Sequence, residues 1–359
     1  MLYRTYRPTT WSEVVGQEHV VRTLQGALET ERIGHAYLFA GPRGTGKTTL
    51  GRLFAKALNC TAKSRKPCGS CDSCVSIEEG RSMDLIEIDA ASNRTIDDMR
   101  ELRENIGAAP TASKYKVYLI DEAHMITKEA FNAFLKTLEE PPAHVIFILA
   151  TTDAAKIIPT VLSRVQRFDF KKPTQQQIVT KLATVAKQEK LKISDGALAA
   201  VAAAADGAFR DAEVMLTKLA SHLGGSAIDE AIAQSVLGLV PLSWHPKFLT
   251  ALAARDRAGA LRFLHEIQAQ GADADQFAKG FLEYLRRVMV AKIDMSILEQ
   301  AGLAMADTQL AHVREFAANM EGAQLVKAIQ AFTDARNRIR TAPIAFFPLE
   351  LAALEVAAP

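Results

Sequence analysis

A glycine-rich segment near the N-terminus carries residues whose types and spacing suit phosphate binding. Its residues are Gly41, Pro42, Arg43, Gly44, Thr45, Gly46, Lys47 and Thr48, and Thr49 comes next. An apolar run, His35–Ala40, precedes the segment, and a helix-like stretch, Thr49–Leu58, follows it. The order of strand, glycine loop and helix is typical of a P-loop, in which backbone N–H groups surround phosphate oxygens. We therefore expect a nucleoside triphosphate here, with Lys47 on the β- and γ-phosphates and Thr48 as a ligand of Mg²⁺.

Two adjacent carboxylates supply the second half of the expected chemistry. Asp121 and Glu122 end the apolar run that begins at Val117. A P-loop enzyme needs one acid to hold Mg²⁺ through water, which fits Asp121, and one base to orient the attacking water, which fits Glu122. His124 completes the letters of a helicase box, but the other helicase motifs are not visible. We interpret His124 as a packing or capping residue beside the site.

Four cysteines lie close together in the sequence, at Cys60, Cys68, Cys71 and Cys74, and the chain has no others. Two overlapping C-x-x-C steps, with Cys60 at the preceding helix end, supply four thiolates for tetrahedral Zn²⁺. A disulfide pair, a redox C-x-x-C site and an iron–sulfur cluster are the alternatives. We expect structural zinc, held in a surface insertion (about residues 60–74) away from the hydrolysis chemistry.

Arg164 stands before the last strand-like run of the first region and allows two interpretations. It is either a surface arginine in an ion pair of little energetic value, or an arginine finger for the γ-phosphate of a neighbouring subunit. The residue types alone do not separate these two roles.

Composition sets the outer limits of the function. The chain has 359 residues, 48% of them hydrophobic, and a formal net charge of +2. We expect two or three domains, no membrane span, no secretory signal and a cytoplasmic location. The small net charge means that any contact with DNA comes from local patches.

The elements that must position these residues fall into three regions. Apolar runs at His35–Ala40, Asp84–Asp89, Lys116–Asp121, Val145–Ala150 and Arg167–Phe170 alternate with helical patterns, among them Thr49–Leu58, Ile96–Ile106 and Lys128–Leu138. This alternation predicts a parallel sheet wrapped by helices. After residue 172 only helical patterns follow, including 196–205 and 210–223, with a break at 238–246. The predicted domains are an α/β P-loop core at 1–172, an all-α domain at 173–237 and a second all-α domain at 238–359.

Several motifs together resemble one family, the bacterial DNA polymerase III tau/gamma subunits, which are AAA+ ATPases of the sliding-clamp loader. They are the P-loop, the four-cysteine insertion, Val14-Val15-Gly16-Gln17, Ile88-Asp89-Ala90-Ala91-Ser92, Asp121-Glu122-Ala123-His124, Leu138-Glu139-Glu140-Pro141-Pro142, Leu149-Ala150-Thr151-Thr152 and Ser163-Arg164. The combination is far more specific than any single motif, and it is strongest over residues 1–237. The family usually has Cys where this chain has Val165, a position expected to pack rather than to touch phosphate.

The resemblance implies a role for further residues. It places Thr152 at sensor 1, Arg164 at the finger that acts in trans, and Arg210 at sensor 2, on the lid helix. It implies that the adenine and ribose are surrounded by Tyr6, Arg7, Pro8, Val14 and Val15. It also implies an AAA+ core, a lid and a collar, with ATP, Mg²⁺ and Zn²⁺ as cofactors.

The resemblance further implies a function. The chain would be an ATPase motor of the DNA polymerase III holoenzyme, in a homo- or hetero-oligomeric ring with delta-type and delta-prime-type subunits. That ring would open the sliding clamp and load it onto primer–template DNA held through its phosphates, with Asn93, Arg94 and Thr95 as candidate contacts. The absence of longer C-terminal domains implies the short form or a truncated one. A non-hydrolysing scaffold subunit and another AAA+ DNA motor, such as a branch-migration helicase, are the alternatives.

Overall fold

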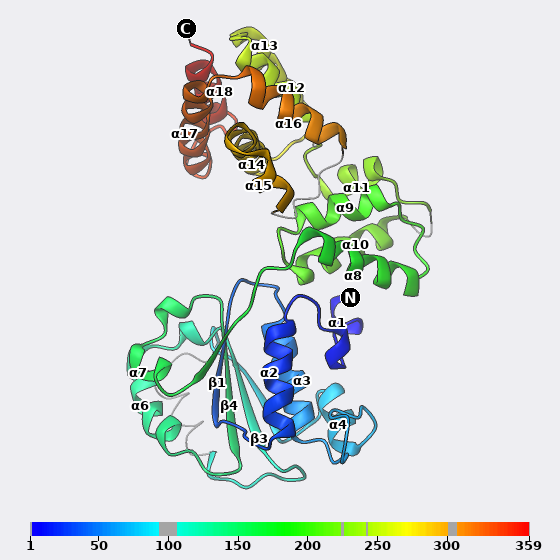
Figure 1. Ribbon diagram of the computed structural model, residues 1–359, viewed down its shortest axis with the longest axis vertical. Coiled ribbons are helices and arrows are strands. Elements are labelled where there is room, and N and C mark those ends of the chain that lie inside the picture. The colour runs from blue at the N-terminus through cyan, green and yellow to red at the C-terminus, as the bar shows by residue number, and fades with distance from the viewer. Residues whose placement is uncertain (1, 93–105, 224–225, 242, 301–306, 359) are drawn as a thin grey trace. The chain divides into compact units, whose positions relative to one another are not determined.

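The computed structural model describes residues 2–92, 106–223, 226–241, 243–300 and 307–358 (Figure 1). The chain forms two compact units, the first comprising Met1–Val185 with Ala205–Thr217 and the second Ala186–Ala204 with Lys218–Pro359. The first unit contains the sheet. Asn93, Arg94, Thr95 and all but the last residue of the predicted helix 96–106 lie outside the described residues.

The sheet has five parallel strands in the order β2-β3-β4-β1-β5. The strands are β1 (Ala36–Ala40), β2 (Leu85–Asp89), β3 (Lys116–Asp121), β4 (Val145–Thr151) and β5 (Gln166–Asp169). All five were expected, and each bound agrees within about one residue, which is the usual uncertainty at element ends. Because the carboxyl ends of parallel strands share one edge, the segments after β1, β3 and β4 come together there.

Helices cover both faces of the sheet, which is why the inner strands β1 and β4 are almost continuously apolar (Figure 1). Leu38 and Phe147 face the layer that contains α6 (Lys128–Glu139) and α7 (Pro159–Leu162). On the opposite face, Phe39 packs with α2 (Glu18–Glu29) and α3 (Lys47–Leu58). Shorter helices of this unit are α1 (Leu2–Thr5), α4 (Asp72–Glu78) and the 3₁₀ turns Trp11–Glu13, Ala123–Met125 and Ala154–Lys156. Val165 packs against the α6 side of the core, as expected.

The chain beyond residue 172 is helical, as predicted. The next four helices are α8 (Gln175–Gln188), α9 (Asp195–Ala204), α10 (Phe209–Leu223) and α11 (Glu230–Leu237). An isolated bridge between Ile193 and Ile228 is the only β pairing among the described residues of this stretch. The structure thus confirms the fold class, an α/β core followed by all-helical regions, while the boundaries of the three domains stay a prediction.

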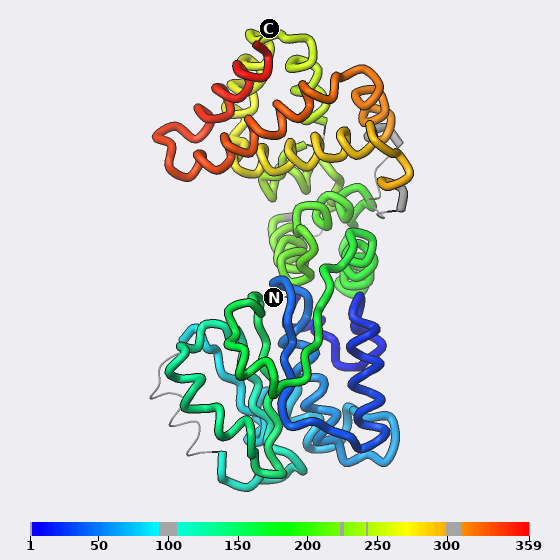
Figure 2. Tube along the Cα trace, turned by 60° about the vertical axis from the view of Figure 1, so that its left-hand side comes forward, coloured from blue at the N-terminus to red at the C-terminus, as the bar shows by residue number. Residues whose placement is uncertain are grey.

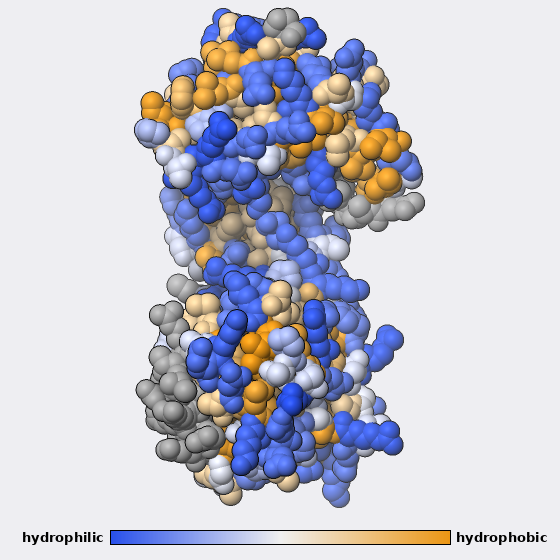
Figure 3. All heavy atoms as spheres, turned by 90° about the vertical axis from the view of Figure 1, so that its left-hand side faces the viewer, coloured by the Kyte–Doolittle hydropathy of each residue, from blue (hydrophilic) through white to orange (hydrophobic). Residues whose placement is uncertain are grey.

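The C-terminal helices share one apolar core. They are α12 (Trp244–Ala253), α13 (Arg257–Ala269), α14 (Ala274–Ile293), α15 (Met295–Gln300), α16 (Asp307–Asn319), α17 (Gly322–Ile339) and α18 (Phe347–Val356). Helices α14, α17 and α18 lie side by side (Figure 2). The rings of Phe248, Phe281 and Phe332 meet edge to face in the shared core. Figure 3 shows apolar atoms at the surface of this unit. Its exposed large apolar side chains include Ile293, Ile344, Phe347 and Leu351.

No helix among the described residues has both the length and the apolar composition needed to cross a membrane.

Candidate functional site

The P-loop segment joins β1 to α3 through a tight turn that only glycine suits at two positions. Gly44 and Gly46 have φ of +75° and +95°, a region that side chains rarely adopt. A Cβ on Gly44 would also lie 2.7 Å from the Cβ of Ala208. The Phe209 N–H donates to the Gly44 carbonyl at 3.1 Å. The turn is therefore packed directly against the start of α10.

Lys47 is the first residue of α3 and is almost fully buried. Its Nζ donates to the carbonyl oxygens of Gly41 and Pro42, both at 2.8 Å. Burial lowers the pKa of this ammonium, while the nearby charges of Glu122 and Asp121 raise it. A buried cation at a helix N-terminus, held by carbonyls of its own loop, is placed to exchange those carbonyls for phosphate oxygens.

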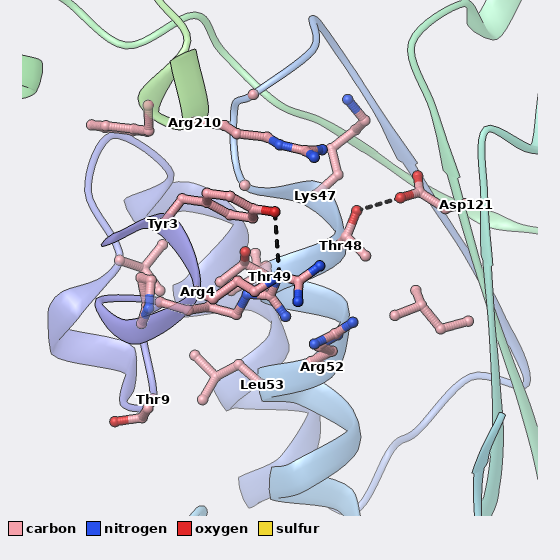
Figure 4. Close-up of a pocket in the computed structure, with 18 of the residues that line it drawn as sticks. Tyr3, Arg4, Thr9, Lys47, Thr48, Thr49, Arg52, Leu53, Asp121 and Arg210 are labelled. Atoms are coloured by element: carbon pink, nitrogen blue, oxygen red, sulfur yellow. Dashed lines mark hydrogen bonds between the residues drawn. The ribbon is translucent and has the colours of Figure 1, made fainter. Parts of the chain in front are cut away.

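Thr48 connects the P-loop to the neighbouring strand β3. Its hydroxyl donates to Asp121 Oδ2 at 2.8 Å, the contact drawn in Figure 4. The second oxygen, Asp121 Oδ1, accepts from the Glu122 N–H at 2.9 Å. One hydroxyl and one carboxylate are thus brought to the same point, and both are oxygen ligands of the kind that Mg²⁺ prefers.

Glu122 is held beside them in a strained conformation. Its φ is 47°, unusual for a residue with a side chain, and such outliers favour a functional position. Its Oε2 accepts from the Thr152 hydroxyl at 2.9 Å and lies 3.4 Å from His124 Nδ1. That His124 nitrogen also lies 3.1 Å from the hydroxyl of the buried Thr151. The end of β4 thereby positions the carboxylate that follows β3.

The side chains of Lys47, Thr48, Asp121 and Glu122 line a pocket of about 860 Å³ in the first unit. Its wall includes most residues expected to bind the nucleotide, namely Arg7, Pro8, Val14, Val15, Arg43, Gly44, Thr45, Gly46, Lys47, Thr48, Thr49, Asp121, Glu122 and Arg210. Tyr6, Gly41, Pro42 and Thr152 lie outside this lining. Of these four, Thr152 bonds Glu122, and the Gly41 and Pro42 carbonyls bond Lys47.

Arg210 reaches the pocket from α10 and meets the N-terminal segment there. Its guanidinium carbon lies 5.0 Å from the centroid of the Tyr3 ring, an arrangement typical of a cation–π contact. Figure 4 shows Arg210, Tyr3 and Lys47 converging on one space. Hydrogen bonding from Arg4 lowers the pKa of Tyr3, with a further contribution from Arg210. The leading peptide therefore closes one side of the pocket.

Arg164 is not part of this pocket. Its Nε donates to Glu139 Oε1 at 2.9 Å, and its Nη1 donates to the Thr160 carbonyl at 2.6 Å and the Ser163 hydroxyl at 3.0 Å. The Arg164 and Glu139 side chains are 33% and 46% exposed. Within one chain the structure therefore shows the ion pair, at a position from which the guanidinium can face a neighbour.

The four cysteines gather at one point, and all of them are free thiols. Their sulfur atoms lie within 4.8 Å of one another. Tetrahedral zinc with bonds of about 2.3 Å requires sulfurs roughly 3.8 Å apart, so the donor set fits this metal. N–H groups of Ser70 and Cys71 lower the pKa of Cys68 to about 5, whereas burial raises the pKa of Cys74 to about 12. A central cation is what would keep the buried Cys74 ionised.

Several residues that line the pocket were not foreseen from the sequence, among them Tyr3, Arg52 and Glu213. Arg52 follows Thr48 by four residues, and Glu213 follows Arg210 by three. Residues at these spacings share one face of a helix, so the spacing could have indicated both Arg52 and Glu213. Tyr3 carries no such signal, because the contact that brings it to Arg210 joins residues far apart in the chain.

Comparison with known proteins identifies the family. Three family models match consecutive parts of the chain. Residues 16–174 match "DNA polymerase III, delta subunit", residues 177–216 match "DNA polymerase III clamp loader subunit, ATPase lid domain", and residues 228–358 match "DNA polymerase III subunits gamma and tau domain III".

Curated relatives and a solved structure agree with these matches. DNA polymerase III subunit tau of Bacillus subtilis is 45% identical over 292 residues, which are 81% of this chain and 52% of that protein. The Escherichia coli subunit tau is 39% identical over 344 residues, 96% of this chain and 53% of that protein. The chain thus spans about half the length of these relatives.

A mutant RuvB of Thermotoga maritima shares the fold, with a TM-score of 0.50 and 20% identity over 69% of this chain and 79% of that one. The chain therefore belongs to the DNA polymerase III tau/gamma family of clamp-loader subunits with the AAA+ fold.

Proposed function

We propose that this chain is an ATPase motor of the bacterial sliding-clamp loader. Binding and hydrolysis of ATP would open the clamp and load it onto primed DNA. The observation that carries the proposal is the junction of three strand ends at one edge of the sheet. There Lys47, Thr48, Asp121 and Glu122 line one pocket, and Thr152 holds the Glu122 carboxylate from outside the lining.

Each side chain has a distinct task in this proposal. Lys47 and the P-loop N–H groups bind the β- and γ-phosphates. Thr48 and Asp121 would hold Mg²⁺, which neutralises the charge that develops on the phosphate oxygens. Glu122 orients the attacking water, and Thr152 fixes the direction of its carboxylate. Arg210 reaches the phosphates from the lid, and the N-terminal segment surrounds the nucleoside.

The ring partners complete the proposed machine. In this proposal Arg164 acts on the nucleotide of a neighbouring subunit. The support is that Arg164 does not line the P-loop pocket of its own chain and that its side chain is partly exposed. The exposed apolar side chains of the C-terminal helices, such as Phe347 and Leu351 on α18, support subunit contacts through that region. We propose delta-type and delta-prime-type subunits, the sliding clamp and primer–template DNA, bound through its phosphates, as partners.

Zn²⁺ in the cysteine cluster is the second metal of the proposal, with a structural task. The cysteines are absent from the pocket lining, so the cluster would hold its surface segment in shape without contacting nucleotide. We propose that the protein works in the cytoplasm, where thiols stay reduced.

Neither alternative explains the site as well. A non-hydrolysing scaffold subunit does not need Glu122 held by Thr152 beside a buried P-loop lysine. A branch-migration helicase shares the fold, but the four-cysteine insertion and the family matches favour the clamp loader.

Nucleotide binding by Lys47→Ala tests the foundation of this proposal. Loss of a buried cation that contacts two phosphates should weaken ATP binding at least about 100-fold, because each charged hydrogen bond contributes roughly 1.5–3 kcal/mol. Titration calorimetry with Mg-ATP measures the effect, with Lys136→Ala on the exposed face of α6 as the matched control. Undiminished binding by Lys47→Ala would sink the P-loop assignment.

A further inference from the structure

Glu213 is a carboxylate in the wall of the P-loop pocket that the proposed chemistry does not use. It lies on α10 and is only 6% exposed, yet it lines the pocket. No hydrogen bond or ion pair reaches its carboxylate from any residue that the structure describes. The Glu213 oxygens are not among the fully enclosed polar atoms that lack a partner, so this mostly buried carboxylate opens onto the pocket and is available to a ligand there.

The contacts on either side of Glu213 show what it faces. Arg210, three residues before Glu213 on α10, lies over the Tyr3 ring. Thr217, four residues after Glu213, accepts a hydrogen bond from the Leu2 N–H at 3.4 Å through its hydroxyl. Residues three and four apart share one face of a helix. Glu213 therefore lies on the face of α10 that covers the N-terminal segment.

Two cations near Glu213 place it toward the nucleoside end of the pocket. Lys181 and Arg7 act on the carboxylate electrostatically, although neither is within ion-pair distance. Lys181 Nζ donates to the Tyr6 carbonyl at 2.9 Å, and Arg7 follows directly. Glu213 lies three residues beyond Arg210, or about 4.5 Å farther along the axis of α10, away from the phosphate-binding end.

We propose that Glu213 accepts a hydrogen bond from the nucleoside half of the bound nucleotide and thereby sets nucleoside specificity. This inference rests on the proposed function. The donor is a ribose hydroxyl or the exocyclic amino group of the base, since the nucleoside presents donors of these two kinds to an acceptor-only carboxylate. Burial raises the pKa of Glu213 to about 7, while Lys181 and Arg7 lower it, so a substantial fraction is ionised at neutral pH.

Binding of matched nucleotides tests the proposal and separates the two donors. Titration calorimetry on the full chain would compare ATP with 2′-deoxy-ATP, 3′-deoxy-ATP and purine riboside triphosphate, which lacks the amino group. The unmodified chain should prefer ATP over at least one analogue by about tenfold, as expected for a hydrogen bond to a charged group. Glu213→Leu should reduce that preference to about one, and Glu213→Gln should keep part of it. The analogue concerned identifies the donor.

The control is Glu129→Gln, an exposed carboxylate on α6 outside the pocket lining, which should leave every ratio unchanged. Without nucleotide, Glu213→Leu should unfold at a higher temperature than the unmodified chain, because an unpaired buried carboxylate is removed. Ratios that are the same in Glu213→Leu and the unmodified chain would overturn the inference alone. No nucleotide binding by the unmodified chain would overturn the proposed function and the inference with it.

Discussion

Lys47, Thr48 and Glu122 each hydrogen-bond to a neighbour on the site's own elements. This local bonding orients each side chain before any ligand arrives, which reduces the ordering that binding requires. The residues of the P-loop were predictable because they are contiguous and their φ values demand glycine. Tyr3 was not, because only the contact of α10 with the N-terminal segment brings it to the pocket.

His245 gives a residue-scale prediction about pH. It is 4% exposed among the rings of Phe277 and Tyr284, and burial lowers its pKa from 6.5 to about 4, with Arg287 adding to the effect. The unfolded chain therefore binds the proton more readily than the folded one. The stability of the C-terminal unit should be complete above about pH 6.5 and fall as the pH drops toward 4, by up to about 3 kcal/mol.

Urea unfolding followed by Trp244 fluorescence measures this loss, in a Trp11→Phe background so that one tryptophan reports. His245→Phe should show a weaker decline between pH 6.5 and 4, because it removes the titrating ring. Equal declines in the two proteins would contradict the prediction.

The strands and long helices were predictable because apolar runs and helical periodicity encode them directly. β3 matches its expected bounds, and α10 begins one residue earlier than expected. The four-residue helix α1 was not foreseen, since so short an element depends on tertiary contacts rather than on its own periodicity. The four cysteines converge on one point because the chain turns between α3 and α4. The glycine and proline near the cysteines suggest such a turn but do not specify its geometry.

The cysteine segment between α3 and α4 gives a prediction at the scale of the element. Elemental analysis should find one zinc per chain, and Cys74→Ser should lose it, because the buried thiolate is one of four ligands. The neighbouring substitution Ser73→Ala is the control and should keep the metal. ATP binding should survive in both variants, since the cysteines do not line the pocket. Metal-free protein from a preparation with added zinc would argue against the site.

Over the whole chain, Arg164 and the P-loop belong to separate surfaces of the first unit. In its proposed role as a finger, Arg164 would serve only the pocket of a neighbouring subunit, and hydrolysis would depend on assembly. This dependence could be suspected only from the resemblance, because no local pattern distinguishes a finger from a surface ion pair. The domain boundaries are likewise set by long-range packing.

Arg164→Ala should keep ATP binding but lower hydrolysis in the assembled ring by about 10³-fold, as for other arginine fingers. Calorimetry on the single chain and steady-state hydrolysis in the ring measure these two effects. Arg167→Ala, which removes a nearby exposed pair with Asp169, should change neither. Undiminished hydrolysis in the Arg164→Ala ring would show that the finger lies elsewhere.

Steady-state ATP hydrolysis tests the central claim most directly. The chain would be mixed with delta-type and delta-prime-type subunits, sliding clamp and primer–template DNA, and each component would be omitted in turn. The account predicts strong stimulation that requires both the clamp and the primed DNA, and that disappears with Lys47→Ala. A hydrolysis rate indifferent to clamp and DNA would contradict the proposal that this chain is a clamp-loading motor.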